Sequence, residues 1–311
     1  MNVVYKRCCG VDIHKKSIVA CVVNERGKKE IRSFGTMTHE ILEFCQWLQL
    51  HKIEMVAMES TASYWKPLFN LLEVQEIPAM LVNAQHIKSV PGRKTDVKDA
   101  EWIADLLRHG LLKASFVPKR PDRELKELVR YRISIVDERA REFNRVDKVL
   151  QGANIKLSSV ASKIDTQSGM DMVRALARGE FDEHVLANMA RGSMREKIDD
   201  LILALKGFIQ PHQQMILKSM LCHIDSLSRQ ISLLDGEIDR RMADKNPIID
   251  ALDTIHGVGR QSAQVILAEI GTDMSVFPSA KHLVSWAGLS PGKNESAGKK
   301  KGVPPQKEIV P

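Results

Sequence analysis

The sequence predicts an α/β domain at the N-terminus followed by a mainly α-helical region, on three observations. Short apolar, β-rich runs alternate with amphipathic helical patterns from residue 3 to residue 107. A long, arginine-rich helical pattern begins after Pro118. Apolar residues then recur at alternating spacings of three and four from Ile216 to Ile238, which is typical of a helix packed along one stripe.

The first region follows a simple order of strands and helices. Glu25 to Lys28 form a hairpin turn between the second and third strands. The predicted elements are strands 3–13, 17–24 and 29–35, a helix capped by Thr38, a strand 54–59, a helix 62–74, a strand 78–82, and a helix that starts near Thr95 and contains Ile103, Leu106 and Leu107. Three antiparallel strands followed by β-α-β-α-β crossovers are the layout of the ribonuclease H-like fold.

Four carboxylates stand at positions where this layout would bring them together. Asp12 is near the end of the first strand and Glu59 ends the fourth, and these strands are neighbours in the predicted sheet. Asp96 and Asp99 are three residues apart, so they share a face of the following helix's first turn. Taken alone, these two aspartates are better explained as a helix cap that complements the helix dipole.

Such a cluster of carboxylates is unfavourable unless a cation fills it. Two unit charges ~4 Å apart repel by about 4 kcal/mol at an intermediate dielectric constant. Oxygen ligands select hard ions, so we expect Mg²⁺ or Mn²⁺, which can activate a nucleophile in phosphodiester chemistry. Each acid also has an ordinary explanation: Asp12 as a strand-end turn residue, and Glu59 as an ion-pair partner of Lys66.

The charge balance indicates an anionic partner. The chain has 311 residues, a net charge of +7 and a pI of about 9.1, which favours nucleic acid among the common partners. Basic residues including Lys15, Arg93 and Lys94 flank the acids, which suggests a track for phosphates. An ordinary solvated surface is the alternative interpretation.

Cysteine usage and hydropathy exclude several other classes. Five irregularly spaced cysteines without a C-x-x-C pair predict neither a disulfide framework nor a zinc site. The N-terminus does not have the pattern of a signal peptide, and no apolar run is long enough to span a membrane. We therefore expect a cytoplasmic protein without a membrane partner.

The helical region carries two long patterns. The arginine-rich helix after Pro118 favours a nucleic-acid-facing or subunit-facing surface, although intervening acids also fit a salt-bridged helix. The stripe from Ile216 to Ile238 predicts a coiled-coil seam, either between subunits or buried within one chain. Residues 152–200 read as short helices, with no role assigned by the sequence, broken at Gly152, Gly169, Gly179 and Gly192.

Two features near the C-terminus bear on DNA. Gly257 and Gly259 form a G-x-G turn that opens a helix at Arg260, so free backbone N–H groups could contact phosphates in the manner of a helix-hairpin-helix motif. A tight helix–helix turn is the alternative. Ser296 lies in a predicted basic loop, and its spacing alone gives it no role.

Five sequence motifs, taken in order, resemble the DEDD transposases of bacterial insertion sequences, the "IS one-ten" family. The resemblance covers nearly the whole chain. The motifs are Gly10-Val11-Asp12-Ile13-His14-Lys15, Met58-Glu59-Ser60-Thr61-Ala62-Ser63-Tyr64-Trp65, Lys94-Thr95-Asp96-Val97-Lys98-Asp99-Ala100, Ile255-His256-Gly257-Val258-Gly259 and Trp286-Ala287-Gly288-Leu289-Ser290-Pro291.

This resemblance implies a RuvC-like domain over residues 1–115, a helical coiled-coil segment over 116–245 and a C-terminal transposase domain over 246–311. It matches Asp12, Glu59, Asp96 and Asp99 to the metal-binding acids and Ser296 to a nucleophile that forms a transient phosphoserine link to DNA. It further implies a homo-oligomer, DNA ends and target as substrates and, for some members, a guide RNA encoded by the element.

The chain departs from the family pattern after Ser296. The family's C-terminal domain normally continues with basic helical sequence, whereas this chain ends in a proline-containing tail at Pro311. We therefore expect a truncated C-terminal domain, for which an inactive nucleic-acid-binding remnant is one alternative function. A Holliday-junction-type nuclease that uses metal-activated water, with no role for Ser296, is another.

Overall fold

In the computed structural model, the five predicted N-terminal strands form one mixed sheet with the order β3-β2-β1-β4-β5. β1 pairs antiparallel with β2 and parallel with β4, and β4 pairs parallel with β5. The strands are β1 (Cys8–Ile13), β2 (Ser17–Val23), β3 (Lys29–Gly35), β4 (Met55–Glu59) and β5 (Ala79–Val82). This topology is compatible with the predicted ribonuclease H-like fold.

The structure describes residues 2–60, 63–83, 99–289, 292–296 and 299–303. The chain divides into two compact units: residues 1–120 together with 272–311, and residues 121–271. We call them the sheet unit and the helical unit, and describe each by itself.

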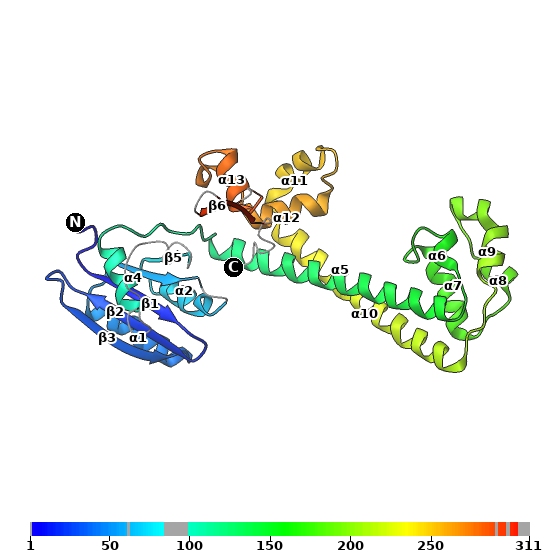
Figure 1. Cartoon of the computed structure of the whole chain (residues 1–311), viewed down its shortest axis with the longest axis horizontal. Helices are drawn as coiled ribbons and strands as arrows, with labels where there is room; N and C mark the ends of the chain where they lie inside the picture. The colour runs from blue at the N-terminus through cyan, green and yellow to red at the C-terminus, as the bar shows by residue number, and fades with distance from the viewer. Residues whose placement is uncertain (1, 61–62, 84–98, 290–291, 297–298, 304–311) are drawn as a thin grey trace. The chain divides into compact units, whose positions relative to one another are not determined.

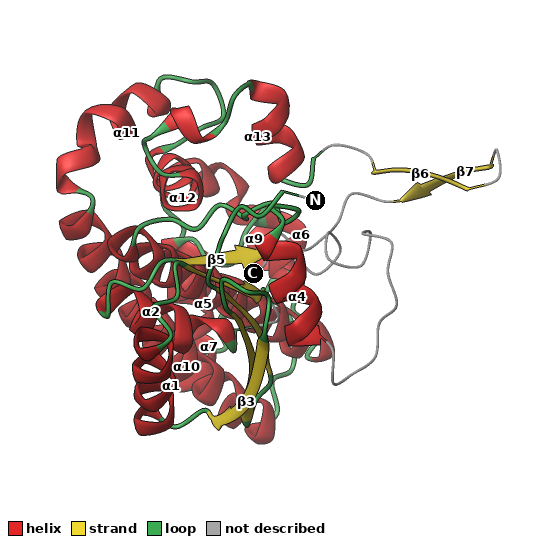
Figure 2. Cartoon of the chain, turned by 90° about the vertical axis from the view of Figure 1, so that its left-hand side faces the viewer, coloured by secondary structure: helices red, strands yellow, loops and turns green. Residues whose placement is uncertain are grey.

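Helices cover both faces of the sheet (Figure 2). α1 (Thr38–Leu50) and α2 (Trp65–Val74) lie on one face, where Phe44, Leu48 and Leu68 pack against Val11 and Met58. α4 (Asp99–Arg108) lies on the other face. Two separate apolar clusters therefore sandwich the sheet, as expected for a mixed sheet with crossover helices.

The start of α1 differs from the expectation. Thr38 is the first helical residue rather than the cap, and Met37 precedes it in an extended conformation. The Glu40 carboxylate accepts a hydrogen bond of 2.9 Å from the Met37 backbone N–H. An acidic residue in the first turn thus satisfies this donor, and Thr38 forms no cap.

Two cations fix α4 against the rest of the sheet unit. The Lys29 ammonium lies 2.7 Å from Glu101 and 2.6 Å from Asp105. Burial would lower the Lys29 pKa, but hydrogen bonds to the two carboxylates raise it overall. At the other end of α4, the buried Arg108 guanidinium donates to the carbonyls of Asn24 at 2.6 Å and Glu25 at 3.0 Å. α4 is therefore tied to β3 and to the turn after β2.

Replacing Arg108 with methionine is expected to destabilise the sheet unit by about 2–3 kcal/mol, because the variant cannot form the charged-donor hydrogen bonds from this buried position to the two carbonyls. Urea denaturation followed by tryptophan fluorescence measures the change, since all four tryptophans lie in this unit. Arg26→Met, at an exposed turn position, is the control and should unfold like the wild type. Equal stability of both variants would contradict the role assigned to Arg108.

Two long helices form the axis of the helical unit, α5 and α10 (Figure 1). They pack antiparallel, because Leu125 and Val129 near the start of α5 meet Ile238 near the end of α10. The elements are α5 (Arg120–Gly152), α6 (Leu157–Val160), α7 (Gln167–Arg178), α8 (Glu183–Ala187), η2 (Gly192–Lys197), α9 (Ile198–Ala204), α10 (Pro211–Arg241), η3 (Ala243–Lys245), α11 (Asn246–Asp253) and α12 (Arg260–Ile270).

The apolar stripe of α10 is buried within the chain along much of its length. Ile224, Leu227, Ile231 and Ile238 are buried as predicted. At the start of the helix the buried positions are Leu217 and Leu221, one residue later than predicted, and Ile216 is exposed. Three arginines of α5 form ion pairs with acids, Arg130 with Glu269, Arg132 with Asp235 and Arg145 with Glu142, which favours the salt-bridged interpretation of α5.

The predicted breaks at glycine are correct at three of the four positions. Gly152 ends α5, Gly179 caps α7 in the left-handed conformation with φ of 100°, and Gly192 begins η2. Gly169 instead lies inside α7, where its N–H donates 3.2 Å to the Thr166 hydroxyl. A Cβ at Gly169 would stand 2.5 Å from the Ile164 carbonyl oxygen, so close packing explains this glycine.

The C-terminal part of the helical unit is a pair of short helices held against α5. α11 and α12 are joined by a turn that contains Gly257, with φ of 86°. Glu269 of α12 accepts hydrogen bonds from Arg130 at 2.7 and 3.0 Å and lies 2.9 Å from Lys126. Burial would raise the Glu269 pKa, but these partners lower it overall, so the carboxylate is held charged.

Residues 272–303 are not wholly helical, which corrects the prediction of an α-helical C-terminal domain. They contain η4 (Met274–Val276), α13 (Ala280–Trp286) and two antiparallel strands, β6 (Gly292–Ser296) and β7 (Lys299–Val303). Phe277 packs between Phe116 and Trp286. Its ring centroid lies 5.9 Å from that of Phe116 and 5.6 Å from that of Trp286. Through this contact the segment joins the end of the N-terminal region within the sheet unit.

A thiol-labelling experiment should find one reactive cysteine in the native protein. Burial raises the pKa of Cys8 and Cys45 to about 11 and that of Cys21 to about 12, and it also raises that of Cys9, so these thiols stay protonated at pH 8. Cys222 is exposed. A chromogenic disulfide reagent should therefore titrate one thiol in buffer and five in denaturant, and Cys222→Ser should leave none in buffer. Rapid labelling of that variant would contradict the burial.

In the part of the chain that the structure describes, every helix is too short or too polar to cross a lipid bilayer.

Candidate functional site

Asp12 and Glu59 lie on adjacent parallel strands at the same edge of the sheet. The register of β1 with β4 pairs Val11 with Met58, and Asp12 and Glu59 are the next residues on each strand. Both are partly buried, with 15% of the Asp12 side chain exposed. The structure therefore brings together two of the four predicted acids at the carboxyl ends of the central strands.

Both carboxylates project from the face covered by α4. Val11 and Met58 pack with α1 and α2, whereas Cys8 and Ala57 pack with α4. Side chains alternate between faces along a strand, so Asp12 shares the face of Cys8, and Glu59 shares the face of Ala57. The two acids thus point toward the same side of the sheet.

α4 begins with the third predicted acid, Asp99. Gly10, two residues before Asp12, lies directly beneath the first turns of this helix. A Cβ at Gly10 would stand 2.2 Å from the Ala100 carbonyl oxygen and 2.3 Å from the Ala104 nitrogen. This close approach places the start of α4 over the face that carries Asp12 and Glu59, and the Asp99 Oδ1 atom is buried there.

The fourth acid and two of the predicted basic residues belong to a part of the chain that the structure does not describe. Asp96, Arg93 and Lys94 lie outside the described residues. Lys15 follows β1 with an exposed side chain, and its carbonyl accepts a 3.1 Å hydrogen bond from Thr36.

His14 belongs to this edge, although the sequence interpretation gave it no role. Its Nε2 atom lies 3.1 Å from Asp12 Oδ2, and 64% of its side chain is exposed. The sequence could have indicated this position, because His14 follows Asp12 by two residues and residues two apart on an extended chain share a face. His14 is suited to orient the Asp12 carboxylate while remaining open to solvent.

The acids fit a hard divalent cation in the chemistry of their ligands. They offer carboxylate oxygens, which suit Mg²⁺ and Mn²⁺, and the buried thiols of Cys8 and Cys21 are held protonated. Among the described residues, however, no three His, Cys, Asp or Glu side chains are close enough together to hold a metal. The two strand-end acids are therefore half of the predicted set, with Asp99 at the adjoining helix start.

The predicted DNA-contacting residues of the helical unit surround the turn between α11 and α12. Gly259 is the N-cap of α12, and a Cβ at either Gly257 or Gly259 would meet no atom of the described residues within 4 Å, so this backbone is open on that side. Arg260 has a structural role: its guanidinium donates to Asn246 at 2.6 Å and Asp250 at 3.1 Å, which ties α12 to α11.

Ser296 is the last residue of β6, where its Cα pairs with that of Lys299. The expectation of a loop at this position is therefore wrong. The polar, basic composition that suggested a loop also suits a two-stranded hairpin. Ser296 belongs to the same unit as Asp12, Glu59 and Asp99.

Comparisons with known proteins agree with the order of the motifs. A model for the DEDD transposase of IS110 elements matches residues 9–155. A model for the transposase IS116/IS110/IS902 family matches residues 249–308. The chain is 27% identical over 224 residues to the insertion element IS110 uncharacterized 43.6 kDa protein of Streptomyces coelicolor, a match covering 66% of this chain and 55% of that protein. It therefore spans about half the length of this curated relative.

The two family models cover both ends of the chain, with the acids in the first and Ser296 in the second. The first match includes the strand ends that carry Asp12 and Glu59, and the second includes residues 272–303, which belong to the same unit. The chain belongs to the IS110 family of insertion-sequence transposases.

Proposed function

We propose that this chain catalyses metal-dependent cleavage and exchange of DNA strands at the ends of its insertion sequence and at a target. The observation that carries this proposal is the position of Asp12 and Glu59 on adjacent strand ends beneath the helix that begins with Asp99. Within an IS110-family chain, these acids are the residues expected to handle phosphodiester groups.

The acidic edge, which we define as the strand ends that carry Asp12 and Glu59, would bind and orient the scissile phosphate. Asp12, Glu59 and Asp99, together with Asp96, would hold Mg²⁺ or Mn²⁺, and His14 would keep the Asp12 carboxylate in position. A bound divalent ion supplies charge stabilisation to a phosphoryl group and its leaving oxygen. Lys15, Arg93 and Lys94 would contact neighbouring phosphates.

Ser296 is the proposed nucleophile. Its Oγ atom would attack a DNA phosphorus, forming an O–P bond while the P–O bond to one deoxyribose oxygen breaks. The serine proton passes to a base, and the leaving oxygen takes up a proton, which conserves the phosphodiester energy in a phosphoserine link. A free hydroxyl is a weak nucleophile at neutral pH, so the reaction needs activation of the kind that the acidic edge could supply.

Further proposals concern the partners. The open backbone at Gly257 and Gly259, with Arg260, would contact DNA phosphates. A homo-oligomer and a guide RNA encoded by the element are proposals that rest on the family. Phosphate contacts predict that DNA affinity falls by about 10³–10⁵-fold between roughly 50 and 200 mM salt if about 6–10 phosphates are neutralised.

A strand-exchange assay on the full chain, with the element's own ends and flanking transcript, tests the proposal. Cleavage should require Mg²⁺ or Mn²⁺ and should stop on chelation. Ser296→Ala separates the serine mechanism from attack by metal-activated water, because cleavage that survives this substitution would support the nuclease alternative. Binding without cleavage in any divalent metal would instead support the nucleic-acid-binding remnant.

A further inference from the structure

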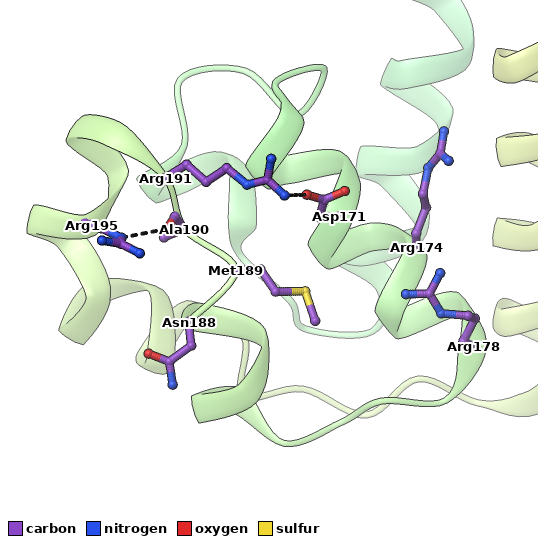
Figure 3. A pocket seen from close by; sticks show the side chains of 8 residues that line it. All are labelled: Asp171, Arg174, Arg178, Asn188, Met189, Ala190, Arg191 and Arg195. Carbon is purple, nitrogen blue, oxygen red and sulfur yellow. Dashed lines mark hydrogen bonds and ion pairs between the residues drawn. The ribbon is translucent and has the colours of Figure 1, made fainter.

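An arginine-lined pocket of about 410 Å³ lies in the helical unit, in a part of the chain between the two segments that match the family models. Figure 3 shows the side chains around it. They come from α7, from the loop after α8 and from η2. The lining residues are Asp171, Arg174, Arg178, Asn188, Met189, Ala190, Arg191 and Arg195.

Positive charge dominates this lining. Arg174 and Arg178 are four residues apart on α7, an arrangement of like charges that costs a helix about 0.2–0.5 kcal/mol. Asp171 pairs with Arg191 at 2.7 Å, and Asp225, outside the pocket, pairs with Arg174 at 2.6 Å. These two acids each neutralise one guanidinium, and among the described residues no carboxylate forms an ion pair with Arg178 or Arg195.

The loop that carries Arg191 is fixed to α7. The Arg191 backbone N–H donates 2.9 Å to the hydroxyl of Ser168, which is buried in the first turn of that helix. Arg195 Nε donates 3.3 Å to the Ala190 carbonyl. The loop after α8 is therefore held against α7 and Arg195 against that loop, so less ordering is needed when a ligand binds.

Some guanidinium donors in this frame have no acceptor among the described residues. A guanidinium has five N–H groups in a planar fork that matches phosphate oxygens. The Arg174 Nε atom is buried without a hydrogen-bond partner in the described structure. The Arg178 side chain is exposed at the pocket, and among the residues that the structure describes it forms no ion pair or hydrogen bond. The exposed guanidinium groups of Arg178 and Arg195 thus remain able to donate to a ligand, while Arg174 and Arg191 are held in ion pairs.

We propose that this pocket binds a phosphate group of a nucleic-acid backbone. The lining has four arginines and one asparagine, but no aromatic ring on which a base could stack, so it favours the backbone over a nucleobase. The choice of nucleic acid as the source of the phosphate rests on the proposed function. The pocket would hold DNA or RNA without reading its sequence.

The double variant Arg178→Gln/Arg195→Gln tests this proposal, because neither arginine has a carboxylate partner in the described structure. The matched control is Arg141→Gln/Arg229→Gln, which removes two exposed charges from α5 and α10 of the same unit. Fluorescence anisotropy of the full chain with a short DNA duplex and an RNA duplex of the same sequence, at roughly 50 to 200 mM salt, gives affinity and salt slope. Circular dichroism checks that each variant is folded.

The pocket variant should bind about tenfold more weakly than the control variant, and its salt slope on duplex DNA should fall by about 0.9 for each phosphate that the pocket no longer neutralises. Weaker binding of DNA alone or of RNA alone identifies the source of the phosphate. Equal affinity and slope in both double variants, with both nucleic acids, would overturn the proposal. This assay measures binding and needs no catalysis. Its result therefore stands even if Ser296→Ala leaves DNA cleavage unchanged.

Discussion

Replacing Gly10 with alanine is expected to destabilise the sheet unit by about 3 kcal/mol or more and to displace the start of α4. The new Cβ would lie 2.2 Å from the Ala100 carbonyl oxygen and 2.3 Å from the Ala104 nitrogen, both backbone atoms that no rotamer change can move. Overpacking a core usually costs about 1–3 kcal/mol, and a clash with helix backbone belongs at the upper end or beyond. Urea denaturation followed by tryptophan fluorescence measures this destabilisation.

Gly236→Ala is the matched control for this substitution. Gly236 lies inside α10, and within the described ranges an added Cβ there would have no neighbouring atom closer than 4 Å. Alanine in a helix interior is favoured over glycine by about 0.5–1 kcal/mol, so this variant should be slightly more stable by circular dichroism. If Gly10→Ala unfolded at the same urea concentration as the wild type, α4 would not pack against β1 as described.

Replacing Asp12 with asparagine is expected to reduce metal-dependent DNA cleavage by at least about 10²-fold. Removing an outer-shell partner of a metal ligand alone typically costs 10–100-fold, and Asp12 is proposed as a direct ligand. The apo protein should keep its stability to within about 1 kcal/mol, because the Asp12 carboxylate pairs only with an exposed histidine among its described ion pairs. Thermal unfolding with and without Mn²⁺ then isolates the metal: the wild type should be stabilised and the variant should not.

Asp165→Asn provides the control for that experiment. Asp165 is exposed in the helical unit, and its substitution makes the same change in net charge. It should leave both cleavage and Mn²⁺ stabilisation at wild-type values. If Asp12→Asn retained both as well, Asp12 would have no part in a metal site.

The central strands and their order were predictable because each carries a short apolar run bounded by turn residues. The strands Cys8–Ile13 and Met55–Glu59 are buried on both faces. Such strands need apolar residues at nearly every position, so they can be recognised from the sequence. Once those strands are neighbours, the positions of Asp12 and Glu59 follow from register alone. The acidic edge is therefore the part of the site that the sequence predicts best.

Features that depend on partners distant in sequence could not be predicted. A helical stripe through Ile216 and one through Leu217 and Leu221 fit the sequence of α10 equally well. The helices that pack on α10 decide that Leu217 and Leu221 are the buried residues. Gly169 looked like a helix break because its close neighbour, the Ile164 carbonyl, is a product of the fold. The pocket arginines are spread from residue 174 to residue 195, and only the turn after α7 brings them together.

The proposed mechanism depends on Ser296, and trapping the proposed covalent link between Ser296 and DNA tests the central claim most directly. The full chain is incubated with labelled end DNA and Mg²⁺, quenched in detergent and digested, and the peptides joined to DNA are identified by mass spectrometry. We predict a phosphodiester link on the peptide that contains Ser296, absent from Ser296→Ala and from Asp12→Asn. The mechanism would be contradicted if Ser296→Ala cleaved DNA strands at the wild-type rate and neither this variant nor the wild type formed a covalent adduct.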